Sequence, residues 1–452
     1  MDSIIIIFLT AIIALFAGMS ANPLRPLIIS IIGLLAAAIL FLFQGQYQSP
    51  FVKYNILNFG KDELRFSLLC IGLTLTILIA GFDKVRKQKS NAADIMSLLM
   101  FSLCGALILI GFSDLSMFFL GLEILSIPLY VLAGSNKENL SSAEAAVKYF
   151  FTGSFFTCFL LLGIAFIYGA TGTFDLQVMQ QLISEGVYSR ALLLVGVFLI
   201  AASLLFKVGA VPFHFWGPDV YQGSPDNVTA FMASVVKIAM LFTFYKFFST
   251  IFADLFSFWS GLVYIAIVLS LFIGYLGALK QQYYKRLVAY SSITHSAFAL
   301  FALLNNQSAA AADLFIFTIG YGFSVVALIT VSMAGLNEED KISNLKGIGR
   351  KYPIVGMLFV FALLSLTGIP PFTGFFGKTL LFYNVFTAYP LLVLFGLIST
   401  AIGGYFYLNL IFTSFSSDAT ATTIRLKTTH QLVLLLCGFF ILSGWLIMLL
   451  PA

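Results

Sequence analysis

The feature that most constrains this chain is a succession of apolar runs, each about 18 to 28 residues long, between short polar or Pro- and Gly-containing breaks. A helix of that length spans a bilayer, whereas the strands of a membrane β-barrel would alternate apolar and polar residues. Hydrophobic residues make up 60% of the 452 positions and charged residues only 10%. No water-soluble fold has enough interior for so much apolar surface. The sequence therefore predicts an all-α polytopic membrane protein and excludes a soluble globular enzyme.

The runs predict about fourteen membrane-spanning helices. Their approximate bounds are 3–18, 25–44, 64–82, 94–112, 115–134, 143–169, 190–213, 227–250, 256–279, 285–305, 309–335, 352–384, 388–413 and 430–450. The first run lacks a basic leading segment and a small-residue cleavage site, so we expect it to be retained as the first span. The connections are too short to hold a separate soluble domain.

Lysine and arginine residues gather in alternate connections between the predicted spans. One side holds four of them: Lys53, Lys61, Arg65 and Arg190. The other side holds fifteen: Arg25, Lys84, Arg86, Lys87, Lys89, Lys137, Lys280, Lys285, Arg286, Lys341, Lys346, Arg350, Lys351, Arg425 and Lys427. Because positive residues remain in the cytoplasm, the larger set predicts the cytoplasmic face. With an even number of spans, both termini are then expected in the periplasm.

Several charged residues remain inside the predicted spans. The lysines are Lys148, Lys207, Lys237, Lys246 and Lys378, and the most central acid is Glu123. A charge at the bilayer centre costs about 2.5–3.5 kcal/mol, so such residues indicate an ion or proton pathway. Lys148 and Lys246 lie nearer the ends of their spans and could instead extend to the surface, Lys246 along Phe244 and Phe247. For the deeper groups, the alternative is a purely structural ion pair.

Two histidines add to this set. His214 and His295 could carry protons near neutral pH, or they could be satisfied polar groups of a packed bundle. Burial favours the neutral form of a lysine and a nearby carboxylate favours its charged form, so a buried lysine beside an acid can load and release a proton. Glu123 is the natural candidate for that acid.

Two predicted spans contain Pro and Gly breaks, 207–225 and 367–378. At an offset of 159, Gly209, Pro212 and Phe213 align with Gly368, Pro371 and Phe372. Each break has a deep lysine nearby, and its unpaired carbonyl groups must face protein or water. Broken helices at matching positions of two halves are typical of a transporter site, although two unrelated kinks would give the same pattern.

The breaks divide the chain into repeats. The first lies in span seven of spans four to eight, and the second in span twelve of spans nine to thirteen. The positions of the two broken spans differ by five, an odd number, so the second repeat is expected to be inverted. The predicted domains are a three-helix segment at 1–93, a first repeat at 94–250, a second repeat at 256–413 and a terminal helix at 430–452.

These residues resemble the antiporter-like proton-channel subunits of respiratory complex I and of the multisubunit Na⁺/H⁺ antiporters. The resemblance covers nearly the whole chain, and its main segments are 121–130, 143–150, 206–223 and 285–295. Within the family, the sequence Val-Tyr-Gln-Gly at 220–223 is similar to the N-type branch. Lys378 stands where M-type members carry Glu, and the chain stops where L-type members continue into a lateral helix. The segment 373–377 departs slightly from the family pattern.

The resemblance implies roles for Glu123, Lys148, Lys207, His214, Lys237, His295 and Lys378. Glu123 would modulate Lys207, and Lys237 and His214 would be links of a central hydrophilic axis. His295 would extend this axis to Lys378, the terminal proton donor or acceptor. Lys148 matches the basic residue of span six.

The function implied is proton translocation in the membrane arm of a bacterial NADH:quinone oxidoreductase, driven by quinone reduction elsewhere in the complex. The chain has no dinucleotide fingerprint, no cysteine cluster for iron–sulfur and no paired haem histidines, so NADH, FMN, iron–sulfur clusters and quinone are expected on other subunits. The expected partners are the other membrane subunits, especially the M-type and the small K-type subunit, and lipids of the inner membrane, with no nucleic acid.

Three alternatives remain. The chain could belong to a multisubunit Na⁺/H⁺ antiporter with no redox partner, or to the membrane arm of a hydrogenase or a ferredoxin-driven dehydrogenase. It could also be a structural scaffold without transport. The cost of the deep charges argues against a scaffold.

Overall fold

The computed structural model describes residues 2–19, 22, 24–43, 56–87, 92–305, 309–335, 340–416 and 427–449, with the side chains of 82–87, 335 and 449 excepted. Within these ranges, twelve helical segments are long and apolar enough to cross a membrane, and two shorter apolar helices, α1 (Asp2–Ala17) and α16 (Pro353–Thr367), complete the set. The segments follow the predicted bounds closely. The all-α membrane fold with about fourteen spans is therefore confirmed.

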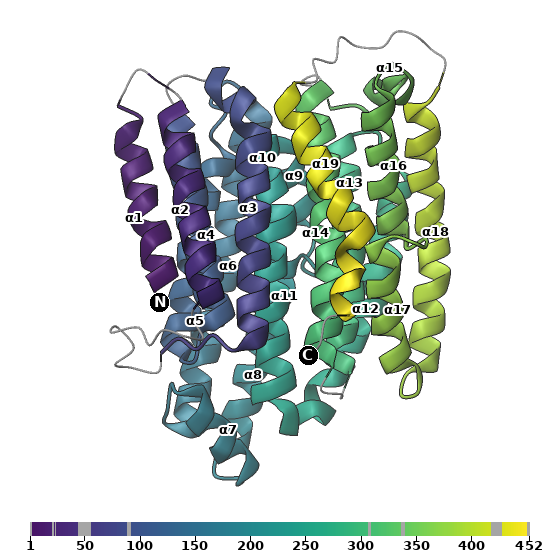
Figure 1. Cartoon of the computed structure of the whole chain (residues 1–452). Helices are drawn as coiled ribbons and strands as arrows, with labels where there is room; N and C mark the ends of the chain where they lie inside the picture. The colour runs from purple at the N-terminus through teal and green to yellow at the C-terminus, as the bar shows by residue number, and fades with distance from the viewer. Residues whose placement is uncertain are drawn as a thin grey trace.

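The helices stand side by side as one bundle (Figure 1). In the first half they are α1, α2 (Leu24–Phe43), α3 (Lys61–Lys87), α4 (Ala92–Gly111), α5 (Leu115–Ala133), α6 (Leu140–Thr171), α7 (Leu176–Ser184), α8 (Arg190–Val208), α9 (Trp216–Gly223), α10 (Asp226–Phe231) and α11 (Lys237–Lys246). In the second half they are α12 (Phe256–Leu279), α13 (Tyr284–Leu304), α14 (Ala310–Gly335), α15 (Ile348–Lys351), α16, α17 (Thr373–Phe386), α18 (Pro390–Ser414) and α19 (Thr428–Ser443). Two π-helical turns, η2 (Met232–Val236) and η3 (Phe247–Ile251), flank α11, and the turn η6 (Gly444–Leu449) follows α19.

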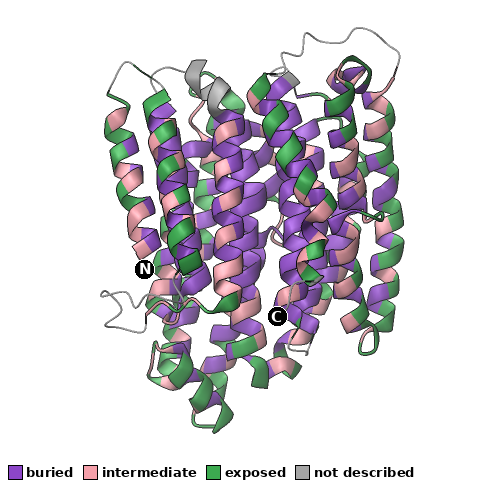
Figure 2. Cartoon of the chain, viewed as in Figure 1, coloured by how far each residue is buried: buried purple, intermediate pink, exposed green. Residues whose placement is uncertain are grey.

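The centre of the bundle is formed by three spans that are almost completely enclosed. The span 226–251, which contains α11, and the spans of α13 and α14 are each 94% buried over their most apolar window. The outer helices α2, α6 and α19 are buried over only 39%, 33% and 33% of theirs. Figure 2 shows the same division, with buried residues on the central helices and exposed ones at the periphery. Polar groups on the central helices are thus shielded from lipid by protein.

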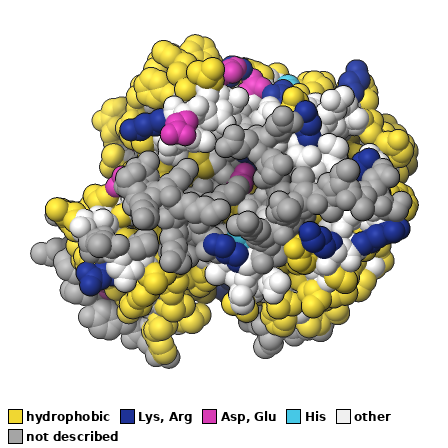
Figure 3. Space-filling model, turned by 90° about the horizontal axis from the view of Figure 1, so that it is seen from above, with side chains coloured by type: hydrophobic (Ala, Val, Ile, Leu, Met, Phe, Trp, Pro, Cys, Tyr) yellow, Lys and Arg dark blue, Asp and Glu magenta, His cyan; other side chains and the backbone are white. Residues whose placement is uncertain are grey.

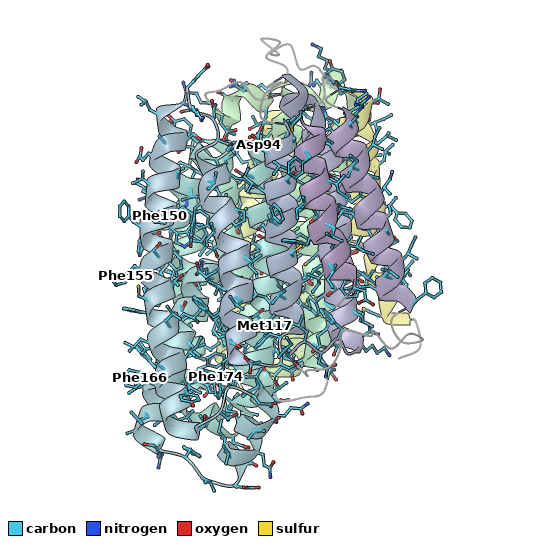
Figure 4. All side chains as sticks on the ribbon, turned by 90° about the vertical axis from the view of Figure 1, so that its left-hand side faces the viewer. Asp94, Met117, Phe150, Phe155, Phe166 and Phe174 are labelled. Atoms are coloured by element: carbon cyan, nitrogen blue, oxygen red, sulfur yellow. The ribbon has the colours of Figure 1, made fainter. Side chains whose placement is uncertain are left out.

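The outer helices present apolar side chains to their surroundings. Phe150 and Phe155 are 50% and 55% exposed, and Figure 4 shows them, with Phe166, along the outer edge of α6. In water such a surface would favour aggregation, whereas lipid tails or a neighbouring membrane subunit cover it without cost.

The two predicted breaks are present, and the spans that contain them run in opposite directions. α8 ends at Gly209 and α16 ends at Gly368, whose φ angles of +70° and +87° are readily adopted only by glycine. α9 and α17 continue the two spans after short irregular segments. In Figure 1 the first span runs from the end of the molecule near α7 towards the opposite end, and the second runs from the end near α15 towards α7. This confirms the inverted repeat.

The two ends of the bundle differ in charge. α1 begins and η6 ends in the half that contains α7 (Figure 1). Figure 3 views the opposite end, where lysine and arginine side chains are spread over the surface and acidic ones are few. The exposed basic residues of this end include Lys280, Lys341, Arg350, Lys351 and Lys427. Lys53, Lys89 and Arg425, also used in the charge count, lie outside the described residues.

Candidate functional site

Lys207 lies in the last turn of α8, directly before the first break. Its side chain is buried, and its Nζ donates hydrogen bonds to the hydroxyl oxygens of Ser126 (2.8 Å) and Tyr130 (3.2 Å) on α5. A cation is also favoured there by the partial negative charge of the helix C-terminus. Lys207 is therefore held by neutral oxygen atoms at the end of an interrupted helix.

Glu123 lies on α5, one helical turn before Ser126. Its carboxylate accepts a hydrogen bond from the hydroxyl of Thr157 on α6 at 2.9 Å, and no ion pair with Lys207 is found among the described residues. Glu123 and the two hydrogen-bond partners of Lys207 are thus on the same helix, α5. Among the described residues, the Lys207 ammonium group is hydrogen-bonded to the hydroxyls of Ser126 and Tyr130 and not to Glu123.

Lys237 begins α11 immediately after the π-helical turn η2, at the centre of the molecule. Its Nζ donates to the backbone oxygen of Ser292 on α13 at 2.8 Å and also to the Ser292 hydroxyl. The hydroxyl of Ser296, one turn further along α13, donates to the Ser292 oxygen (3.0 Å) and reaches the Val208 oxygen at the end of α8 (2.7 Å). Through Ser292 and Ser296, α13 thus connects Lys237 with the backbone oxygen of Val208, the residue that follows Lys207.

His295, three residues after Ser292 on α13, reaches the second break. Its Nδ1 lies 2.8 Å from the Ser291 oxygen and its Nε2 lies 3.2 Å from the Leu366 oxygen, near the end of α16. Lys378 on α17 donates to the same Leu366 oxygen at 2.6 Å and to the Thr367 oxygen at 3.2 Å. His295 and Lys378 therefore meet at one carbonyl group. This places the two predicted residues next to each other.

The environment of Lys378 explains how a cation is tolerated there. The side chain is 4% exposed, and its Nζ lies 4.4 Å from the centre of the Phe298 ring. Free carbonyl oxygens at a helix C-terminus and the face of an aromatic ring both attract a cation. No described carboxylate forms an ion pair with Lys207, Lys237 or Lys378. All three deep lysines are thus held by neutral oxygen atoms.

Lys148 is in a different setting, near the basic end of the molecule. Its Nζ pairs with Glu144 on α6 (2.6 Å) and with Asp219 on α9 (2.5 Å). The second oxygen of Asp219 accepts from Arg286 of α13 at 2.5 Å, and Arg286 also donates to Gln222 at 3.1 Å. The Lys148 side chain is 41% exposed. The structure places it in a surface-facing ion-pair cluster, apart from the contacts of the three deep lysines.

Lys246 lies in the last turn of α11, at the end of the bundle that contains α7. It was expected to extend along Phe244 and Phe247 to the surface. Instead its Nζ pairs with Glu63 of α3 at 3.1 Å, donates a hydrogen bond to the Ile110 oxygen at 3.2 Å and lies 5.0 Å from the centre of the Phe112 ring. The pair borders a cavity of about 140 Å³, so Lys246 is neutralised within the protein.

His214 lies in the connection between α8 and α9 and is half-buried. Within the described residues, its ring forms no hydrogen bond with the deep lysines, so the structure does not bring it into the central set.

The two breaks align in their glycine and proline residues, but the lysines near them do not align. At the offset of 159, Lys207 corresponds to Leu366, and Lys378 corresponds to Asp219. Lys207 precedes its break and Lys378 follows its own. The Lys378 side chain reaches back to the carbonyl of Leu366, the position equivalent to Lys207. Lys207 therefore lies on α8, at the end of that helix, whereas Lys378 reaches the equivalent end of α16 from α17.

The side chains around the deep lysines that sequence reasoning missed are uncharged. Ser126, Tyr130 and Ser292 accept hydrogen bonds from the lysines, and Ser296 and Tyr321 contact Ser292 in turn. Single hydroxyl groups give no distinct sequence signal in an apolar helix. Spacing gave one clue, because Ser292, His295 and Ser296 follow one another at helical intervals on the same span.

No metal-ligating set is found in the described part of the chain, where no three His, Cys, Asp or Glu residues gather as they would around an ion. Its four cysteines are unpaired, and three of them are buried.

Comparison with known proteins assigns the chain to a family. The sequence pattern of the family described as NADH:quinone oxidoreductase/Mrp antiporter, TM, matches residues 112–403. NADH-quinone oxidoreductase subunit N of Cytophaga hutchinsonii is 34% identical over 98% of this chain and 97% of its own length. The protein of the same name from Flavobacterium psychrophilum is 35% identical over 96% of this chain and 95% of its own length. The chain belongs to this family of antiporter-like membrane proteins, and these relatives within it are N subunits.

Solved structures share the fold. A chain of respiratory complex I from Thermus thermophilus superposes with a TM-score of 0.84 at 27% identity, covering 99% of this chain and 98% of that one. A chain of the Mrp complex from a Dietzia species superposes with a TM-score of 0.80 over 98% of this chain and 94% of its own. At 18% identity the second likeness concerns the fold alone.

Proposed function

We propose that the chain is the N-type, proton-translocating membrane-arm subunit of an NADH:quinone oxidoreductase. The observation that supports this most directly is the combination of full-length similarity to N subunits with three buried lysines held by neutral oxygen atoms around α13. Its partners are then the other membrane subunits, including the M-type and the small K-type subunit. NADH, FMN, iron–sulfur clusters and quinone are bound by other subunits.

In the proposed mechanism, quinone reduction elsewhere in the complex changes the field around Glu123, which lies one turn from the Ser126 contact of Lys207. Weakening that field favours release of the Lys207 proton. The proton passes to Lys237 through water and the hydroxyl-lined surface of α13, and then by way of His295 to Lys378 and outward. The Ser296 link between the Val208 and Ser292 oxygens and the carbonyl shared by His295 and Lys378 support this order.

A native gel tests the assignment. Gently solubilised membranes containing the tagged chain are separated and stained in the gel for NADH dehydrogenase activity. We expect the tag to migrate with a large NADH-oxidising band. Migration in a smaller, stain-negative assembly of membrane proteins would contradict the assignment and favour the Na⁺/H⁺ antiporter, and Na⁺-dependent proton exchange in vesicles would then be measured.

The basic end of the molecule, which contains α15, is assigned to the cytoplasm on the positive-inside rule. In a Cys158→Ser background, a cysteine introduced at exposed Glu185 should react with a membrane-impermeant maleimide in intact spheroplasts. A cysteine introduced at exposed Lys351 should react only after permeabilisation. The reverse pattern would show that the termini are cytoplasmic.

A further inference from the structure

The hydroxyl of Tyr321 lies where the contacts of Lys237 and His295 meet. Tyr321 is on α14 and is only 2% exposed. Its hydroxyl lies 2.9 Å from the Ser292 hydroxyl, which in turn contacts Lys237. Its ring stacks on the His295 ring, with the ring centres 5.2 Å apart and the planes inclined by 25°. Tyr321 therefore contacts both Ser292, the partner of Lys237, and His295, the neighbour of Lys378.

Counting hydrogens gives one consistent orientation of these hydroxyl groups when Tyr321 donates to the Ala233 oxygen. Ser292 and Tyr321 each have one hydroxyl hydrogen. The Tyr321 hydroxyl donates to the Ala233 oxygen of η2 at 2.8 Å, so the hydrogen between Tyr321 and Ser292 comes from Ser292. The Ser292 hydroxyl then offers only a lone pair to Lys237. Both Ser292 oxygens accept from the lysine, an arrangement that favours the charged ammonium form.

The alternative orientation has the opposite effect. If the Tyr321 hydroxyl turns its hydrogen from the Ala233 oxygen to Ser292, the Ser292 hydroxyl is free to donate. It can then hydrogen-bond the lone pair of a neutral Lys237 amine. No atom other than hydroxyl hydrogens needs to move. The Ala233 oxygen belongs to a π-helical turn, in which the regular α-helical hydrogen bonding is interrupted, and it anchors the first orientation.

Resting on the function proposed above, we propose that Tyr321 is a positioning residue that selects, through the Ser292 hydroxyl, whether Lys237 holds its proton. The two hydroxyl groups form a two-position switch beside the central lysine. The ring of Tyr321 connects this switch to His295, the neighbour of Lys378.

The test uses Tyr321→Phe in the assembled complex, because phenylalanine keeps the ring that stacks on His295 and removes only the hydroxyl. NADH-driven proton pumping of membrane vesicles is measured as a function of pH. Without Tyr321 to receive its hydrogen, Ser292 is no longer held as an acceptor, so the ammonium form loses support. We expect the alkaline limb of the pumping profile to move to lower pH by about one unit. Ser292→Ala should shift it in the same direction, and the double variant should shift no further.

The matched control is Tyr284→Phe. Tyr284 is equally buried, and its hydroxyl donates to the Leu328 oxygen at 3.0 Å, away from the deep lysines. It should lower thermal stability to a similar extent and leave the pH profile in place. If Tyr284→Phe moved the profile as Tyr321→Phe does, or if neither Tyr321→Phe nor Ser292→Ala moved it, the switch would be wrong. Pumping that survives Lys237→Met would instead contradict the proposed function itself.

Discussion

Replacement of Lys378 by alanine should reduce proton pumping per NADH oxidised by at least about tenfold, while the complex still assembles. In the proposed mechanism, Lys378 is the terminal proton carrier, and removal of a positioned proton-transfer group typically costs about 100-fold in rate. The measurement is the pumping of membrane vesicles, divided by their NADH oxidation, with assembly checked on a native gel. Normal pumping by a fully assembled variant would remove Lys378 from the pathway.

The control for this substitution is Lys280→Ala at the basic end of the molecule. Lys280 is exposed at the end of α12, so its loss should leave pumping and assembly unchanged. Lys378→Met adds a second control, because methionine retains much of the side-chain volume beside Phe298. A pumping defect shared by the alanine and methionine variants would come from the lost amine, and a defect confined to alanine would come from the cavity.

Replacement of Glu123 by glutamine should slow turnover by about tenfold. Glutamine keeps an oxygen that can accept the Thr157 hydrogen bond, so the change removes charge and little else. Unit charges about 8 Å apart interact by about 2 kcal/mol at an effective dielectric of about 20, which corresponds to more than tenfold in an equilibrium. The measurement is the rate of NADH-driven pumping at saturating substrate.

Glu144→Gln is the comparison for Glu123→Gln. Glu144 pairs with Lys148 on the same helix, but its side chain is 61% exposed, and exposed ion pairs contribute about 0–1 kcal/mol. It should therefore have a small effect on turnover. If Glu123→Gln pumped at the normal rate, the coupling of Glu123 to Lys207 would be excluded. If both variants were equally slow, the slower turnover would come from the loss of any negative charge and not from the position of Glu123 on α5.

The sequence was sufficient to predict the spans, the two breaks and their inversion. A bilayer imposes its thickness on every crossing helix, and Gly209 and Gly368 mark the interruptions directly, so these features are recorded locally in the chain. Of the predicted site residues, the structure places His295 and Lys378 at one carbonyl and leaves Lys148 and His214 apart from the deep lysines.

The partners of the charged residues could not be predicted. Hydrophobic periodicity identifies a helix but not the rotation that aims each side chain, so the hydroxyls of Ser126 and Tyr130 were not foreseen as partners of Lys207. For the same reason, the pairs Lys246–Glu63 and Lys148–Asp219 join helices distant in sequence and were missed. The sequence places a lysine near each Pro–Gly break, but Lys207 lies before its break and Lys378 lies after its own.

The single helix α13 contacts both interrupted helices, through Ser296 at the end of α8 and through His295 at the end of α16. A packed helix moves as a rigid rod, so a shift along its axis that weakens one contact must also disturb the other. The two inverted halves therefore cannot relax independently. Thermodynamic reciprocity then requires that, if proton binding in one half changes the proton affinity of the other through α13, the reverse effect has the same free energy.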